Sequence, residues 1–166
     1  RNLMYTSQQK NMGPFVIRYP RGRGVTIDWQ TPMKKVKVGK GRKLQSGEDL
    51  AILSVGHIGN FATDAIKELE KEYNLSIAHY DMRFVKPIDE GILNEVGKNF
   101  KNIITLENGT IVGGLGTAVM EFMNEHNYSP AIKRIGIPDK FIEHGSQDEL
   151  YRECEMDKEG IIKAVK

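Results

Sequence analysis

From residue 50 to the end of the chain, short apolar runs alternate with segments whose apolar residues recur at helical spacing. Residues 50–55 are apolar at all but one position, as in a strand whose two faces are both covered. Further strands are expected at residues 76–80, 102–106 and 131–135. Strands that alternate with helices form a mostly parallel sheet. The pattern therefore predicts a three-layer α/β/α domain.

Caps and prolines predict where the helices begin and end. Asn60 is expected to cap a helix that runs to Asn74, and Pro87 is expected at or near the first position of the next helix. A glycine-rich turn at residues 109–116 precedes a third helix, and residues 147–153 form a short fourth one. The last helix carries the apolar residues Ile161, Ile162 and Val165.

Val36 and Val38 alternate with lysines, which predicts an antiparallel edge strand next to the parallel ones. The six basic residues in the segment 34–43 would then lie on a solvated edge and discourage pairing with other chains. Such a run could also contact nucleic acid. It contains no aromatic residue, so no nucleic-acid partner is expected.

Residues 1–25 do not follow the alternation of strands and helices. They are expected to be the last helix and strand of a preceding domain, with the strand near residues 15–17, followed by a linker. Residues 26–166 are then the α/β domain. The chain begins with Arg1 and not with methionine, which suggests a part of a longer polypeptide.

Composition is that of an ordinary globular domain, with 39% hydrophobic and 28% charged residues and a formal net charge of +2. A single cysteine, Cys154, excludes an internal disulfide framework and favours a reducing compartment, so a cytoplasmic location is expected. No apolar run approaches the length of a bilayer span, and no membrane partner is expected.

The string at residues 17–22 places two arginines around a proline. Pro20 restricts Tyr19 to extended backbone, so Arg18 and Arg21 are expected on a rigid loop. A guanidinium binds phosphate oxygens in pairs and stays charged, which makes a phosphate site one interpretation. Ion pairs with Asp or Glu of a neighbouring domain are the other, and the residues by themselves favour it.

Other candidate residues follow the predicted strands. Asp81 and Arg83 lie where α/β sheets place ligand contacts, but they can also satisfy each other or the loop backbone. His144 shares a loop with Asp139, yet no serine or cysteine nucleophile completes a triad. The backbone N–H groups of residues 113–116 could hold an anion, although their spacing fits no nucleotide motif and close helix packing is the more ordinary use of such glycines.

The remaining ionisable residues suggest no active site. Glu107 is one carboxylate without a partner acid, and His57 is expected to be solvated or to cap a helix. The four histidines lack the spacing of metal ligands. No catalytic or metal-binding residue is therefore expected in this chain.

The strings at residues 17–22, 81–87, 113–114 and 136–139 together resemble the C-terminal part of the 1-deoxy-D-xylulose-5-phosphate synthase family, over nearly the whole chain. The string at 81–87 is the most specific of them. Transketolases and the β subunits of 2-oxoacid dehydrogenases share the fold but not that string, and they are the alternative families. A stand-alone anion-binding α/β module is the third interpretation.

The resemblance implies a thiamine diphosphate and Mg²⁺ enzyme that condenses pyruvate with D-glyceraldehyde 3-phosphate and releases CO₂, in the synthesis of isoprenoid and thiamine precursors. It implies a homodimer in which other domains of the same polypeptide hold the cofactor and the catalytic acids, so that this part is inactive alone and binds no cofactor. It also implies that residues 1–25 are the tail of a preceding pyrimidine-binding domain and a linker. The family role that maps here is phosphate binding by Arg21. Arg18, Tyr19, Asp81, Arg83 and His144 are weaker candidates. Asn108 follows Glu107 where the family has a second glutamate, which puts an interdomain contact there in doubt.

Overall fold

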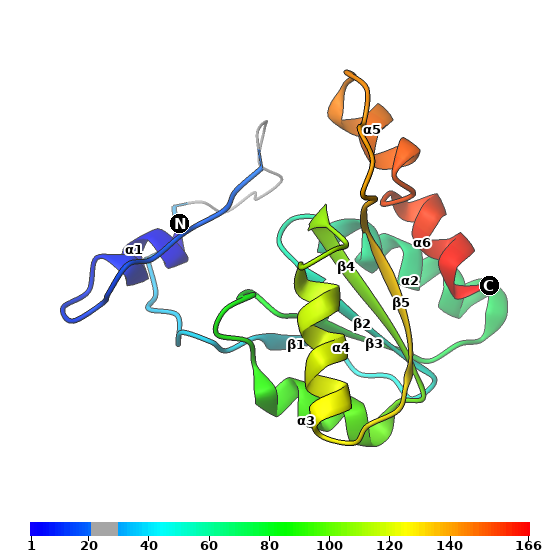
Figure 1. The fold of residues 1–166 in the computed structure, drawn as a ribbon, viewed down its shortest axis with the longest axis horizontal. Helices are drawn as coiled ribbons and strands as arrows, with labels where there is room; N and C mark the ends of the chain where they lie inside the picture. The colour runs from blue at the N-terminus through cyan, green and yellow to red at the C-terminus, as the bar shows by residue number, and fades with distance from the viewer. Residues whose placement is uncertain (21–29) are drawn as a thin grey trace. The chain divides into compact units, whose positions relative to one another are not determined.

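The computed structural model describes residues 1–20 and 30–166, which divide into two units, residues 1–38 and residues 39–166 (Figure 1). The larger unit contains a five-stranded sheet in the order β1-β3-β2-β4-β5. The strands are β1 (Arg42–Gln45), β2 (Leu50–Val55), β3 (Ile77–Asp81), β4 (Asn102–Thr110) and β5 (Ala131–Ile137). β1 is antiparallel to β3, and the other neighbours are parallel.

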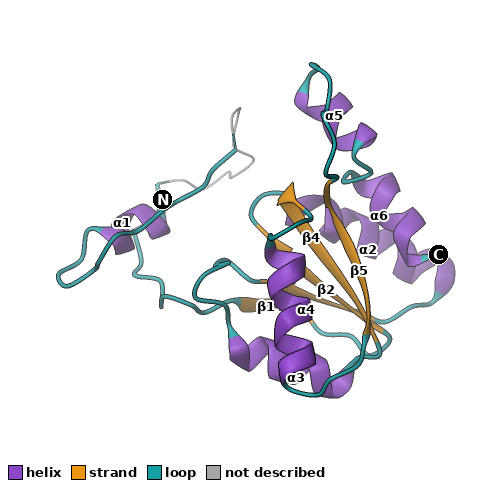
Figure 2. Cartoon of the chain, in the orientation of Figure 1, coloured by secondary structure: helices purple, strands orange, loops and turns teal. Residues whose placement is uncertain are grey.

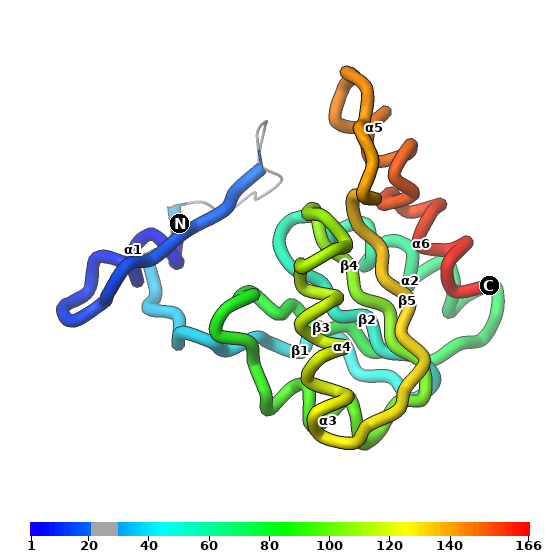
Figure 3. Tube along the Cα trace, viewed as in Figure 1, coloured from blue at the N-terminus to red at the C-terminus, as the bar shows by residue number. Residues whose placement is uncertain are grey.

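Each parallel strand leads to the next through one helix, as the chain trace shows (Figure 3). These helices are α2 (Gly59–Tyr73), α3 (Glu90–Asn99) and α4 (Leu115–Glu125). Two further helices, α5 (Gln147–Glu153) and α6 (Lys158–Val165), follow β5. The described residues contain no helix with the length and apolar character needed to cross a bilayer.

The sheet has helices on both faces (Figure 2). Alternate residues of β2 point to opposite sides. Leu50 and Ile52 belong to the core under α2 and α6, whereas Ala51 and Leu53 belong to the core under α3 and α4. Burial on both sides explains why β2 is apolar along almost its whole length. The predicted three-layer α/β fold with a mostly parallel sheet is confirmed.

The antiparallel edge strand exists, but its predicted position was wrong. Val36 and Val38 lie outside any strand, and β1 begins at Arg42. The backbone N–H of Val36 donates to the Thr6 hydroxyl at 2.8 Å within the smaller unit. That bond replaces the ladder contact that the alternating pattern suggested.

The start of α3 also differs from the prediction. Pro87 lies before the helix, and the N-cap is Asp89, whose side chain accepts from the backbone N–H groups of Gly91 and Ile92. An aspartate side chain can accept from these free N–H groups, which a proline cannot do.

In the smaller unit, α1 (Asn2–Ser7) is the predicted helix at the start of the chain. The apolar run at residues 15–17 was predicted to be a strand, and this was wrong, because residues 13–20 have no regular secondary structure. Residues 31–38 are held to α1 by side-chain contacts, such as the bond from the Lys34 N–H to Asn2 Oδ1 at 3.1 Å.

Candidate functional site

Four parallel strands, β2 to β5, end at the same edge of the sheet, and their following loops carry most of the polar residues that the sequence singled out. In open α/β sheets this carboxyl edge is where ligands bind.

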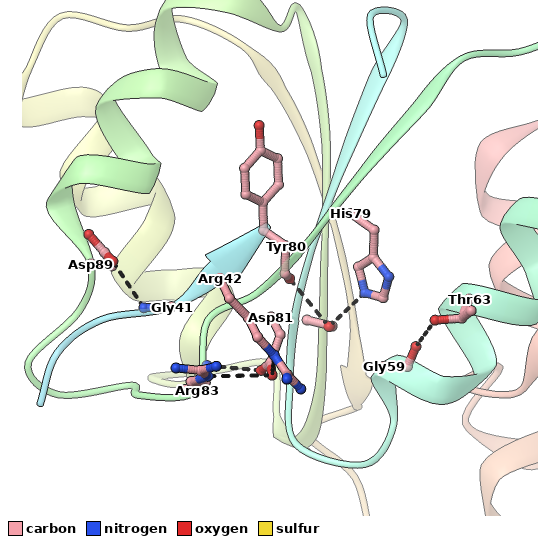
Figure 4. A network of polar contacts seen from close by, with 10 residues as sticks. Gly41, Arg42, Gly59, Thr63, His79, Tyr80, Asp81, Arg83 and Asp89 are labelled. Atoms are coloured by element: carbon pink, nitrogen blue, oxygen red, sulfur yellow. Dashed lines mark hydrogen bonds and ion pairs between the residues drawn. The ribbon is translucent and has the colours of Figure 1, made fainter. Parts of the chain in front are cut away.

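Asp81 ends β3 and lies between two arginines (Figure 4). Its Oδ2 is 3.0 Å from Nε of Arg42, which is its cross-strand neighbour on β1, and 4.0 Å from Nε of Arg83. Its Oδ1 accepts the backbone N–H of Arg83 at 3.1 Å. Asp81 thus pairs with Arg83 and with the loop backbone, the arrangement that the sequence offered as the alternative to ligand binding.

His79 is a buried ionisable residue next to this cluster, and sequence reasoning missed it. It is 1% exposed, and its Nε2 lies 2.8 Å from Oγ of Ser54, which also donates weakly to the Tyr80 carbonyl (Figure 4). The pKa of His79 is lowered to about 4, and burial is the largest cause. The charge of Asp81 raises this pKa, whereas the charge of Arg42 lowers it further. The imidazole is therefore neutral at physiological pH. One histidine in an otherwise apolar strand gives no sequence signal of such a pair.

Glu107, at the end of the buried part of β4, caps helix α4. Its Oε2 accepts the N–H of Leu115 at 2.8 Å and its Oε1 accepts the N–H of Gly116 at 2.9 Å, while only 4% of the residue is exposed. A carboxylate at this place compensates the positive end of the helix dipole. The anion that the N–H groups of residues 113–116 could hold is therefore supplied by the chain itself, which removes the main support for a free anion site there.

The glycines of this turn serve the same cap. A Cβ atom on Gly114 would lie 2.1 Å from Glu107 Oε2 and 2.5 Å from the Thr110 carbonyl oxygen. One on Gly116 would lie 2.7 Å from Thr105 Oγ1. The glycines thus permit close approach of the helix start to β4, in agreement with the packing interpretation.

His57, after β2, is half-buried and not simply solvated or a helix cap, which corrects the expectation. Its Nε2 lies 2.8 Å from the hydroxyl of Tyr151 on α5. The side-chain amide of Asn108, near the end of β4, lies 3.5 Å from the same hydroxyl. A histidine from the turn after β2, a tyrosine from α5 and an amide from β4 thus meet at the carboxyl edge.

Of the other predicted site residues, Arg21 lies outside the part of the chain that the structure describes. Arg18 and Tyr19 are exposed in the unit formed by residues 1–38, and His144 is exposed in the loop before α5. In the described part of the chain, no group of three His, Cys, Asp or Glu side chains could hold a metal ion.

Comparisons with known proteins agree with the resemblance seen in the sequence. Residues 39–161 match the family described as Transketolase, C-terminal domain. The chain is 57% identical over 165 residues to a 1-deoxy-D-xylulose-5-phosphate synthase of Bacteroides thetaiotaomicron, covering 99% of this chain and 26% of the relative. The synthase of Cytophaga hutchinsonii is 56% identical over 167 residues, with 100% and 26% covered.

A solved structure titled "Split gene transketolase, inactive beta4 tetramer" superimposes with a TM-score of 0.74 and 30% identity, covering 81% of this chain and 44% of that one. The predicted resemblance and fold are confirmed. The chain spans about a quarter of the length of the curated relatives that it matches.

Proposed function

Because this chain belongs to the transketolase C-terminal domain family, we propose that it forms the C-terminal part of an enzyme of the 1-deoxy-D-xylulose-5-phosphate synthase type. In that reaction pyruvate loses CO₂, and its remaining two carbons join the aldehyde carbon of D-glyceraldehyde 3-phosphate. The observation that carries the proposal is 57% identity over 99% of the chain to a protein with that name.

The part played by this chain is structural support and substrate binding. Residues 1–25 are proposed to complete a preceding pyrimidine-binding domain, and residues 26–166 to pack against the other domains and to contribute to a homodimer. Arg21 is proposed to bind the phosphate of glyceraldehyde 3-phosphate, as the matching string in the family implies. A cytoplasmic location is proposed as well, because residues 1–166 contain a single cysteine and therefore no internal disulfide framework.

Thiamine diphosphate and Mg²⁺ would belong to the whole enzyme. The described residues of this chain offer no group of acidic and histidine side chains that fits a metal ion, so no step that involves the cofactor is assigned to them. We therefore expect residues 1–166 alone to be inactive.

The alternatives are less well supported. Relatives that are 57% and 56% identical carry the synthase name, which disfavours a transketolase or a dehydrogenase β subunit. A stand-alone anion-binding module is disfavoured because Glu107 already binds the N–H groups of Leu115 and Gly116.

The test is a product assay with the full-length protein. Pyruvate labelled in its carboxyl carbon should release labelled CO₂ when glyceraldehyde 3-phosphate, thiamine diphosphate and Mg²⁺ are present, and mass spectrometry should detect 1-deoxy-D-xylulose 5-phosphate. Residues 1–166 alone should form no product. Transfer of a two-carbon unit from a ketose phosphate, without labelled CO₂, would instead identify a transketolase.

A further inference from the structure

Arg83, in the loop between β3 and α3, has a strained backbone. Its φ is +56°, a conformation that residues other than glycine rarely adopt. The loop is fixed in this shape by the bond from the Arg83 N–H to Asp81 Oδ1 and by one from the Phe84 N–H to the Met82 carbonyl. Strain of this kind concentrates at sites where a side chain must be held in one position.

The guanidinium of Arg83 lacks hydrogen-bond acceptors. It carries five N–H donors. Its contact with Asp81 is 4.0 Å long, beyond hydrogen-bond distance, and within the described residues it makes no hydrogen bond. The nearer partner of Asp81 is Arg42, at 3.0 Å, and only 29% of the Arg83 side chain is exposed. A half-buried guanidinium whose only carboxylate has a closer partner keeps free donors, which points to an acceptor that the described residues do not supply.

The surroundings of Arg83 are positive and partly apolar. Arg42 and Arg83 face a single carboxylate, that of Asp81, and the exposed Lys86 follows three residues after Arg83 in the same loop. Val85, two residues on, is 43% exposed. A surface with an exposed valine and excess positive charge is complementary to a protein surface that has an acidic residue at its centre.

We propose that Arg83 binds a carboxylate of the polypeptide that lies outside residues 1–166, and so anchors this domain to the rest of the enzyme. The proposal rests on the proposed function, since the chain spans only 26% of its relatives and most of their length is available as the partner. A planar guanidinium matches a planar carboxylate with two parallel hydrogen bonds. A free phosphate is a less suitable ligand for Arg83. The backbone N–H groups of Arg83 and Phe84 already donate to Asp81 and to the Met82 carbonyl, so they cannot bind phosphate oxygens.

Hydrogen exchange of the full-length protein, followed by mass spectrometry, tests the contact. The variant is Arg83→Asn, because asparagine tolerates a positive φ and its short side chain carries no guanidinium. Loss of a hydrogen bond to a charged group should accelerate exchange about 10-fold or more in residues 82–89. A second segment, outside residues 1–166 and containing an Asp or Glu, should accelerate with it. Arg83→Lys should restore part of the protection.

Glu155→Asn is the matched control, because Glu155 also has a positive φ, of 52°, and forms an exposed ion pair with Lys163. Such a pair contributes little, so exchange outside residues 1–166 should not change. The proposal is overturned if Arg83→Asn changes no segment outside residues 1–166. It is also overturned if inorganic phosphate, and not the rest of the chain, protects residues 82–89. Hydrogen exchange does not depend on catalysis. Failure of the product assay can therefore be distinguished from absence of the proposed Arg83 contact.

Discussion

His79 lies on β3 with 1% of its surface exposed and with Ser54 as its hydrogen-bond partner. Its pKa is lowered to about 4 by burial, with Asp81 opposing and Arg42 adding to the shift, whereas a histidine in an unfolded chain titrates near its ordinary value of about 6.5. Between these values the unfolded state binds a proton that the folded state does not. The stability that depends on neutral His79 is therefore fully present above about pH 6.5 and is lost as the pH falls through about 4.

We predict that His79→Gln flattens this part of the pH dependence. The full shift corresponds to about 3 kcal/mol of unfolding free energy, and the slope between the two pKa values to about 1.4 kcal/mol per pH unit. Urea denaturation at a series of pH values from 7 down to 4 would measure it. Carboxylates also titrate near the lower end, so the relevant quantity is the difference between wild type and variant. Equal slopes for the two proteins would contradict the assignment.

At the level of elements, the Glu107 cap couples the end of β4 to the start of α4. Gly114→Ala would place a Cβ atom 2.1 Å from Glu107 Oε2 and 2.5 Å from the Thr110 carbonyl oxygen. The carboxylate must then move away from the N–H groups of Leu115 and Gly116. We expect a loss of about 2 to 4 kcal/mol of unfolding free energy, from overpacking together with the weakened charged hydrogen bonds.

Gly109→Ala is the control for this prediction. A Cβ atom there would lie 3.4 Å from the same Glu107 oxygen, an ordinary contact, so stability should stay within about 1 kcal/mol of wild type. Chemical denaturation of both variants measures the difference. If Gly114→Ala were as stable as Gly109→Ala, the cap would not be the reason for the glycine.

The elements that the sequence predicted well are those with a strong local pattern. β2 and α5 were predicted at their observed bounds. β2 is apolar on both faces, and in the structure the N-cap of α5, Ser146, forms a capping box with Glu149. β1 could not be found in this way. Its four residues are exposed or half-buried, so no alternation marks it, and Val36 and Val38 showed a better pattern without forming a strand. Pairing with β3, about 40 residues away, decides its position.

At the scale of the whole molecule, motifs and contacts gave different kinds of information about the site. The string around Arg21 pointed to a phosphate role through resemblance. By contrast, the neutral His79 and the unsatisfied guanidinium of Arg83 depend on which residues the sheet brings together, and no local pattern reports that. The sequence predicted the contact of Asp81 with Arg83, because the two residues lie two positions apart in one loop. It did not predict the ion pair of Asp81 with Arg42, because Arg42 comes from another strand, β1.

The last prediction concerns Arg21 in the full-length protein. Its place after Pro20 limits the entropy lost on binding, and its guanidinium can make two charge-assisted hydrogen bonds to a phosphate dianion. Loss of a hydrogen bond to a charged group costs about 1.5 to 3 kcal/mol, so Arg21→Ala should raise the KM for glyceraldehyde 3-phosphate about 10- to 150-fold. The KM for pyruvate should hardly change, because pyruvate carries no phosphate. Arg18→Ala, in the same string, is the control and should have a smaller effect that does not single out the aldehyde. An aldehyde KM within about twofold of wild type in Arg21→Ala would remove the phosphate role, since a lost ground-state contact must appear in that constant.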